Sequence, residues 1–239
     1  MSSVLFWDFH GTLIYPDSLW SPQYLKTIRR YFPQCTVTEA EIRAAFPAGS
    51  YPWDHPEQDY TSLNTPELWW RHMEEAFHTM YLRCGFTENE ARFLSKNTRE
   101  QLICPELFRF YPDVRPQLKK FQNMGFQNAI LSNNFPELEQ VISAQGYSDL
   151  FDCCISSACN GFEKPRRELF EFARYRTGYP QECWMIGDNL SADIEGGNNA
   201  GFHTVLLRGK KSSLADVCCN DLYELETYFK QHAIKKHRG

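Results

Sequence analysis

The chain has 239 residues, of which 42% are hydrophobic and 23% are charged. This size and composition are typical of a folded globular protein with one large or two modest domains, and they exclude a disulfide miniprotein and a wholly disordered chain. The formal net charge of −5 repels a polyanion over most of the surface, so we expect no nucleic-acid partner.

The first predicted element is a buried strand at 4–7, an apolar run that stops at Asp8. Strand-like runs are then missing from about 16 to 106. Helical spacing of apolar residues in this segment predicts helices at 22–32, 39–46, 66–84 and 88–103. We interpret 16–106 as a small all-helical cap domain, because an insertion beside the carboxyl end of a strand can fold over a site there.

The cap is rich in aromatic residues, and most of them fit a helical core. One face of the helix at 66–84 is predicted to be buried and is formed by Leu68, Met73, Phe77, Met80 and Cys84. Trp53 and Tyr60 lie instead in the proline-rich loop 47–66. This loop is either a substrate-facing lid or a plain surface loop, and the sequence leaves both interpretations open.

Helical patterns alternate with short apolar runs in the rest of the chain. Helices are predicted at 113–124, at 136–144, after 165 and at 190–199, and strands at 128–131, 153–156, 183–186 and 203–207. The alternation predicts an α/β protein with a doubly wound, Rossmann-like, mostly parallel sheet, in a core domain made of 1–15 and 107–239. The loops that begin at Asp8, Ser132 and Asp188 are expected to converge at the carboxyl ends of the strands.

Four short segments resemble, in order, the four motifs of the haloacid dehalogenase-like hydrolases. They are Asp8-Phe9-His10-Gly11-Thr12, Ser132, Lys164-Pro165, and Gly187-Asp188 through Asp193. Each motif alone is weak, but four in order over residues 3–207 are specific. The helical insert lies between the first two motifs, where helical caps of this family commonly occur. The resemblance implies the family's fold and a hydrolase activity.

The resemblance implies that Asp8 is a nucleophile, which attacks phosphorus and forms an aspartyl-phosphate. Two anions must approach each other in this step, so a cation is needed. The resemblance implies Mg²⁺ held by Asp8, the backbone carbonyl of His10 and Asp188, with Asp193 completing or orienting this acidic shell. A single aspartate at a strand end is often only a turn residue, but the combination favours the functional interpretation.

Phosphate binding is assigned to other motif residues by the same resemblance. Ser132 matches the phosphate-binding hydroxyl, and Lys164 matches the lysine that neutralises charge on both phosphate and nucleophile, which makes it a catalytic and a substrate-binding candidate. Thr12 and Asn133 are further candidates for substrate binding. Lys164-Pro165 is also typical of a helix start, because proline suits the first helical position.

His10 departs from the family pattern, because phosphatases of the family carry there a second aspartate that acts as general acid and base. Histidine can donate and accept protons near neutral pH, so it can replace that aspartate. Alternatively, its side chain contributes little and only its carbonyl serves the metal. Dehalogenases and phosphonate hydrolases also lack the second aspartate. Asp188 favours phosphoryl chemistry over metal-independent dehalogenation, and nothing marks Lys26 as a Schiff-base lysine.

The sequence therefore predicts a Mg²⁺-dependent phosphohydrolase that acts on a small phosphorylated metabolite. A catalytically weak phosphate-binding protein and a metal-independent haloacid dehalogenase are the alternatives.

No apolar run approaches the roughly 20 residues of a membrane helix, and no signal sequence is evident, so we expect a cytoplasmic protein without a membrane partner. The nine cysteines are expected to be free thiols. Neither the substrate nor an oligomeric state follows from these patterns.

Overall fold

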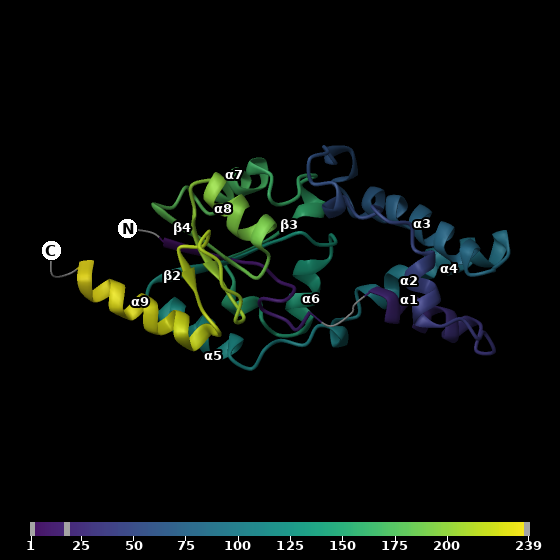
Figure 1. The fold of residues 1–239 in the computed structure, drawn as a ribbon, viewed down its shortest axis with the longest axis horizontal. Helices are drawn as coiled ribbons and strands as arrows, with labels where there is room; N and C mark the ends of the chain where they lie inside the picture. The colour runs from purple at the N-terminus through teal and green to yellow at the C-terminus, as the bar shows by residue number, and fades with distance from the viewer. Residues whose placement is uncertain (1–2, 17–19, 237–239) are drawn as a thin grey trace.

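The computed structural model describes residues 3–16 and 20–236, with side chains placed as far as Gln231. A sheet of six parallel strands, in the order β3-β2-β1-β4-β5-β6, forms its centre (Figure 1). The strands are β1 (Ser3–Trp7), β2 (Phe126–Ser132), β3 (Cys153–Ser156), β4 (Glu182–Gly187), β5 (His203–Leu206) and β6 (Val217–Cys218). The predicted α/β class with a doubly wound parallel sheet is confirmed.

Helices cover both faces of this sheet. The helices of the core are α5 (Val114–Asn123), α6 (Leu138–Ala144), α7 (Arg167–Arg176), α8 (Gly196–Asn199) and α9 (Leu222–Lys236). In Figure 1, α5 and α9 lie on one face, and α7 and α8 lie on the other. Successive side chains of β1 alternate between the faces, so Trp7 packs near Phe121 of α5, whereas Phe6 packs in the cluster of Phe170 of α7.

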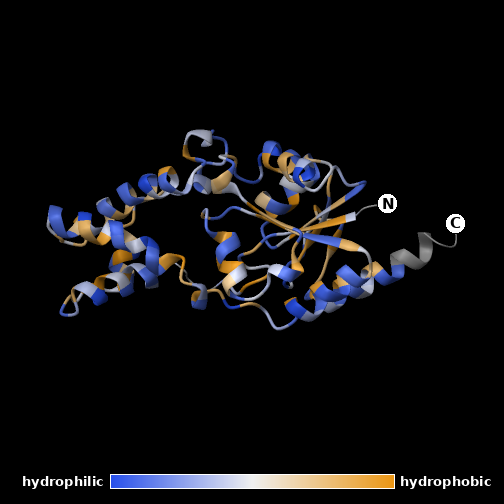
Figure 2. Cartoon of the chain, turned by 180° about the vertical axis from the view of Figure 1, so that it is seen from behind, coloured by the Kyte–Doolittle hydropathy of each residue, from blue (hydrophilic) through white to orange (hydrophobic). Residues whose placement is uncertain are grey.

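Four α-helices that lie between β1 and α5 in the chain form a separate helical lobe at the end of the molecule opposite to α9 (Figure 1). Its helices are α1 (Trp20–Tyr31), α2 (Glu39–Ala45), α3 (Pro66–Arg83) and α4 (Glu88–Leu102), and they pack against one another. Threonines start three of them: the side chains of Thr38, Thr65 and Thr87 accept hydrogen bonds from the first-turn backbone. Figure 2 shows mixed hydropathy along these helices, as expected when each buries one side.

Short helical turns complete the chain. The 3₁₀ turns are Pro52–Asp54, Thr61–Leu63, Pro105–Leu107, Ser148–Leu150 and Ser157–Cys159, and a π-helix spans Leu190–Glu195. The predicted helix at 190–199 is therefore helical throughout but of two types. No helix in the described part of the chain is long and apolar enough to cross a membrane. All nine cysteines are free, as predicted.

Two local predictions are wrong. Leu68 is 37% exposed, because it lies five residues before the buried Met73 and so about 140° around the helix from it. The buried stripe of α3 instead runs from Trp69 and Trp70 through Met73. Pro165 does not occupy the first helical position, since α7 begins only at Arg167.

Candidate active site

A cleft of about 370 Å³ opens where the loops after β1, β2 and β4 meet. These strands end at the same level, because Trp7 of β1 is paired with Ile130 and with Ile186. Polar residues of the cleft include Asp8, Ser132, Asn133, Lys164, Asp188 and Asp193. The structure thus brings residues of all four motif segments to one place.

Asp8 directly follows β1, and its backbone N–H donates to the carbonyl of Ile186 at 2.9 Å. Its carboxylate is mostly buried and accepts two hydrogen bonds on the same oxygen. The Ser132 hydroxyl donates to Oδ1 at 3.1 Å, and the Lys164 Nζ donates to Oδ1 at 2.8 Å. Two donors on one oxygen fix the orientation of the carboxylate, which prepares it to react with a group held in the cleft.

The Lys164 ammonium is buried between two carboxylates. Besides Asp8, it donates to Oδ1 of Asp193 at 2.5 Å, and the Asp193 side chain is fully buried. Burial by itself lowers the pKa of Lys164, but the charges of Asp193 and Asp8 outweigh it and raise the pKa above the ordinary value. Lys164 therefore carries a positive charge at neutral pH, in contact with the candidate nucleophile.

Asp8, Asp188 and Asp193 form an acidic cluster, in which one carboxylate oxygen of each lies within 4.8 Å of the others. Two glycines permit this close approach. A Cβ on Gly11, whose φ is +76°, would lie 2.6 Å from Oδ2 of Asp188, and a Cβ on Gly187 would lie 2.0 Å from Oδ2 of Asp193. A larger residue at either position would displace a carboxylate of the cluster.

The acidic cluster fits a magnesium ion in its chemistry, because Mg²⁺ prefers hard carboxylate oxygens. Three carboxylates in one cleft also repel one another unless cations compensate them. Lys164 compensates Asp8 and Asp193, and the Lys210 Nζ lies 2.8 Å from Oδ2 of Asp188. The candidate ligands named from the sequence are therefore close together. The expected Lys164 bridges Asp8 and Asp193, and Lys210, which the sequence patterns did not indicate, contacts Asp188.

His10 lines the cleft beside Asp8, and Asn134 holds its ring. The backbone N–H of Phe135 donates to Oδ1 of Asn134, so the Asn134 amide nitrogen faces the Nδ1 of His10, at 3.3 Å. Burial lowers the pKa of His10 to about 4, although Asp8 opposes this effect. The ring is therefore neutral in this arrangement, and Asn134 places its proton on Nε2, which is buried without a hydrogen-bond partner in the described structure.

The other two predicted substrate contacts are placed differently. Asn133 lines the cleft, but its amide is engaged: Nδ2 donates to the carbonyl of Lys164 at 2.9 Å, and Oδ1 accepts from the Lys164 N–H at 2.7 Å. This pair of bonds fixes the backbone of the loop that carries Lys164, which we call the lysine loop. Thr12 is fully buried and is not part of the cleft lining, whereas its carbonyl accepts two hydrogen bonds from Arg208. The structure gives no support to Thr12 as a substrate contact.

Sequence reasoning missed several residues at the cleft. Asn134 follows Ser132 and Asn133 directly, and this polar run after a strand was its only signal. Lys210 carried no signal, since it meets Asp188 from a loop 22 residues away. Trp20 and Pro56 of the helical lobe were also missed, and both line the cleft. Of the two aromatic residues singled out in loop 47–66, Trp53 lines the cleft and Tyr60 does not.

Comparison with known proteins agrees with this geometry. A family model described as haloacid dehalogenase-like hydrolase matches residues 3–201. The chain belongs to this family. The haloacid dehalogenase-like hydrolase resemblance seen in the four motifs is thereby confirmed, and the protein is a hydrolase.

Individual relatives of this haloacid dehalogenase-like hydrolase have different names. It is 29% identical to the pyrimidine 5′-nucleotidase YjjG of Escherichia coli K12, over 73% of this chain and 83% of the relative. It is 28% identical to (S)-2-haloacid dehalogenase 4A of Burkholderia cepacia, over 69% of this chain and 71% of the relative. The solved 2-haloacid dehalogenase of Pseudomonas syringae pv. Tomato shares the fold, with a TM-score of 0.68 at 19% identity, over 97% of this chain and 99% of that one.

Proposed function

We propose that this protein is a Mg²⁺-dependent phosphohydrolase that acts on a small phosphorylated metabolite through an aspartyl-phosphate on Asp8. The observation that carries the proposal is the arrangement around Lys164. Its ammonium joins the Asp8 carboxylate to Asp193, beside Asp188, in a cleft at the carboxyl end of a parallel sheet. A nucleophile, a buried cation and an acidic cation-binding cluster are what transfer of a phosphoryl dianion requires.

The chemistry follows from the positions of these side chains. A carboxylate oxygen of Asp8 forms a bond to phosphorus while the bond from phosphorus to the leaving oxygen breaks. Lys164 and Ser132, which already contact Asp8, are placed to donate to the phosphoryl oxygens as charge moves toward the leaving group. Water then cleaves the acyl phosphate, which releases inorganic phosphate and restores the carboxylate. The neutral His10 ring lies beside Asp8, where a proton must be exchanged in both steps.

Asp8, Asp188 and Asp193 would hold the Mg²⁺, with the His10 carbonyl as a further ligand implied by the family. When bound, the ion neutralises negative charge shared between the carboxylates and the phosphate. The cluster favours this interpretation over metal-independent dehalogenation, because three adjacent carboxylates repel one another, and also repel the carboxylate of a haloacid, unless a cation compensates them. The name of one relative, a pyrimidine 5′-nucleotidase, also favours phosphate-ester chemistry.

Residues 16–106 act as a cap in this proposal, and 1–15 with 107–239 form the catalytic core; residues 1–2, 17–19 and 237–239 lie outside the described structure. Specific contacts connect the two parts across this boundary. The Trp70 ring N–H and Arg99 of the lobe both donate to the buried Glu137 carboxylate of the core. The Tyr60 N–H donates to the carbonyl of Gly161 at 2.9 Å. These contacts hold the lobe beside the cleft.

The test is hydrolysis of p-nitrophenyl phosphate by the purified protein with Mg²⁺ or with a chelator. We expect Mg²⁺-dependent turnover that is lost in Asp8→Asn and kept in Asp149→Asn, a surface carboxylate away from the cleft. Full activity of Asp8→Asn would refute the mechanism. Halide release from a 2-haloacid in the presence of chelator would instead establish the dehalogenase.

A His10→Asp variant in the same assay separates the remaining alternatives. If histidine is a competent proton donor and acceptor, the turnover of His10→Asp should be little higher than that of the wild type. If wild-type protein accumulates a phosphorylated Asp8 without turnover and His10→Asp turns over, the protein is a phosphate-binding member of the family rather than an efficient phosphatase. Mass spectrometry of the intact protein measures that accumulation.

A further inference from the structure

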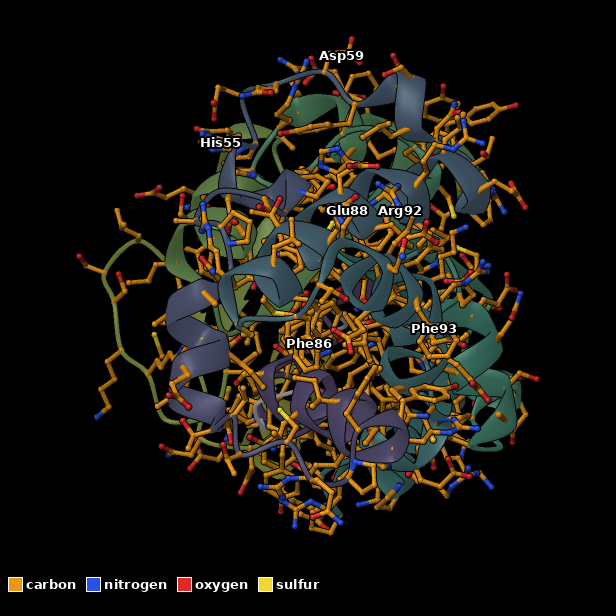
Figure 3. The ribbon with its side chains drawn as sticks, turned by 90° about the vertical axis from the view of Figure 1, so that its right-hand side faces the viewer. His55, Asp59, Phe86, Glu88, Arg92 and Phe93 are labelled. Atoms are coloured by element: carbon orange, nitrogen blue, oxygen red, sulfur yellow. The ribbon has the colours of Figure 1, made fainter. Side chains whose placement is uncertain are left out.

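One side of the cleft is aromatic and comes from the helical lobe. Trp20 at the start of α1, with Trp53 and Pro56 of the loop between α2 and α3, faces the same cavity as the motif residues. The loop runs along the upper edge of the lobe in Figure 3, where His55 and Asp59 are labelled. We call Trp20, Trp53 and Pro56 the aromatic wall. Both indoles are half-buried, so part of each stays open to the cleft.

Rings packed behind the aromatic wall fix its position. Trp53 stacks on Tyr51 with 4.8 Å between ring centroids and an interplanar angle of 8°, and Tyr51 stacks on Phe46 at 5.0 Å and 19°. Trp20 packs against both Tyr51 and Trp53, at 4.8 and 5.7 Å. The Tyr51 hydroxyl is 2.5 Å from that of Tyr24, which is buried in the lobe. A ligand that binds this wall therefore meets rings that lose little conformational freedom.

The composition of the cleft restricts what can bind beside the phosphate. Among the described residues that line it, Lys164 is the one lysine or arginine, and it already contacts Asp8 and Asp193. Lys210 lies outside this lining and is paired with Asp188, so a leaving group with its own carboxylate or second phosphate would meet no unpaired cation among these residues. The aromatic wall also presents mostly carbon atoms of its rings and of the proline. It therefore offers few hydrogen bonds to the hydroxyl groups of a sugar. It matches a flat, uncharged ring.

We propose that the aromatic wall stacks on a planar aromatic or heteroaromatic ring in the leaving group of the substrate, so that Trp20 and Trp53 determine specificity. The substrate class is a phosphomonoester that carries such a ring, as nucleoside monophosphates do. This inference rests on the proposed phosphohydrolase function and narrows it. Stacking between a ring and an indole tolerates many ring types, because every such ring has a π-face.

The experiment compares kcat/KM for two ring-bearing substrates, adenosine and uridine 5′-monophosphate, with glycerol 3-phosphate, which has no ring. We expect the wild type to prefer the ring-bearing esters. Trp53→Ala should lose about tenfold or more in kcat/KM for them, while the value for glycerol 3-phosphate changes less than about twofold. Trp53→Phe keeps a ring and should retain most of the preference. Phe93→Ala, on the outer face of the lobe (Figure 3), is the matched control.

Binding is measured separately from turnover. In an Asp8→Asn background, titration with uridine 5′-monophosphate should quench tryptophan fluorescence, and adding Trp53→Phe should reduce the quench. Equal kcat/KM for esters with and without a ring, or equal losses for all esters in Trp53→Ala, would overturn the specificity role and leave the phosphohydrolase standing. Absence of turnover of any phosphomonoester would refute the proposed function, and the fluorescence titration would then decide whether the wall binds rings.

Discussion

Glu163 offers a sharp test of how the lysine loop is built. It precedes Lys164, and its carboxyl is 1% exposed, with Oε2 buried and without a hydrogen-bond partner in the described structure. Burial raises its pKa to about 7, although a hydrogen bond from Ser157 and the charge of Lys164 act in the opposite direction. Glu163 also lies close enough to the Tyr60 hydroxyl of the helical lobe for its negative charge to help raise the pKa of Tyr60, after the larger effect of burial. A carboxyl in this setting favours its protonated form in the folded protein.

The consequence is a loss of stability as the pH rises. The ordinary pKa of a glutamate is 4.5, so between pH 4.5 and about 7 the folded protein binds a proton at this site that the unfolded chain has released. Stability from this group is fully present below pH 4.5 and declines through pH 7. At about 1.36 kcal/mol per pKa unit, the difference between 4.5 and 7 corresponds to about 3 kcal/mol at most. Glu163→Gln keeps the shape of the protonated acid and removes the titration.

The measurement is the free energy of unfolding in urea at pH 5, 6, 7 and 8. Relative to wild type, Glu163→Gln should gain stability steadily from pH 5 to pH 7 and then level off. Glu171→Gln, at a partly exposed position of α7 where the carboxylate pairs with Arg167, controls for removal of one negative charge. A difference between Glu163→Gln and wild type that is independent of pH would show that the folded carboxyl ionises normally, and the reasoning from burial would be refuted.

Three further changes have defined outcomes. Lys210→Gln removes the ammonium that competes with a cation for Asp188, so calorimetric titration should show Mg²⁺ binding about two- to fivefold tighter, and weaker binding would contradict this. Glu137→Ala removes the acceptor shared by two side chains of the lobe and should lower the urea unfolding free energy by about 1–3 kcal/mol. Gly161→Ala places a Cβ 2.4 Å from the Thr61 backbone, so proteolysis of the loop between α2 and α3 should accelerate, and an unchanged rate would show that this contact does not hold the loop.

Local patterns predicted most of the sheet and its helices, because a buried strand or an amphipathic helix is written in consecutive residues. The 4–7 run became β1, and Asp8 follows it as expected. Strand β6 was not predicted, since two residues carry no periodicity and its pairing with β5 is decided by tertiary contacts. Leu68 was misplaced for a related reason: Trp69 and Trp70 set which side of α3 is buried, and their packing depends on tertiary contacts.

The motif residues could be predicted to converge, but their mutual contacts could not. Lys164 was expected to act on the phosphate and the nucleophile, yet its bond to Asp193 depends on side-chain directions from two different loops. Asn134 and His10 are 124 residues apart, so their hydrogen bond leaves no trace in spacing. Motif patterns indicate the residue types that a reaction needs. The three-dimensional arrangement decides which of these residues neutralise each other's charge, orient each other or bury each other.

The cleft joins two surfaces that come from different parts of the chain. This explains why the reaction can be predicted from the sequence more readily than the substrate. Its charged floor follows the ends of β1, β2 and β4, whose parallel register forces Asp8, Ser132 and Asp188 together. Its aromatic wall comes from an insertion whose packing is independent of that register. A change in the insertion can therefore alter the ring that is bound without moving the nucleophile. For this reason the sequence indicates the reaction through the floor, while the choice of substrate depends on where the lobe places its tryptophans.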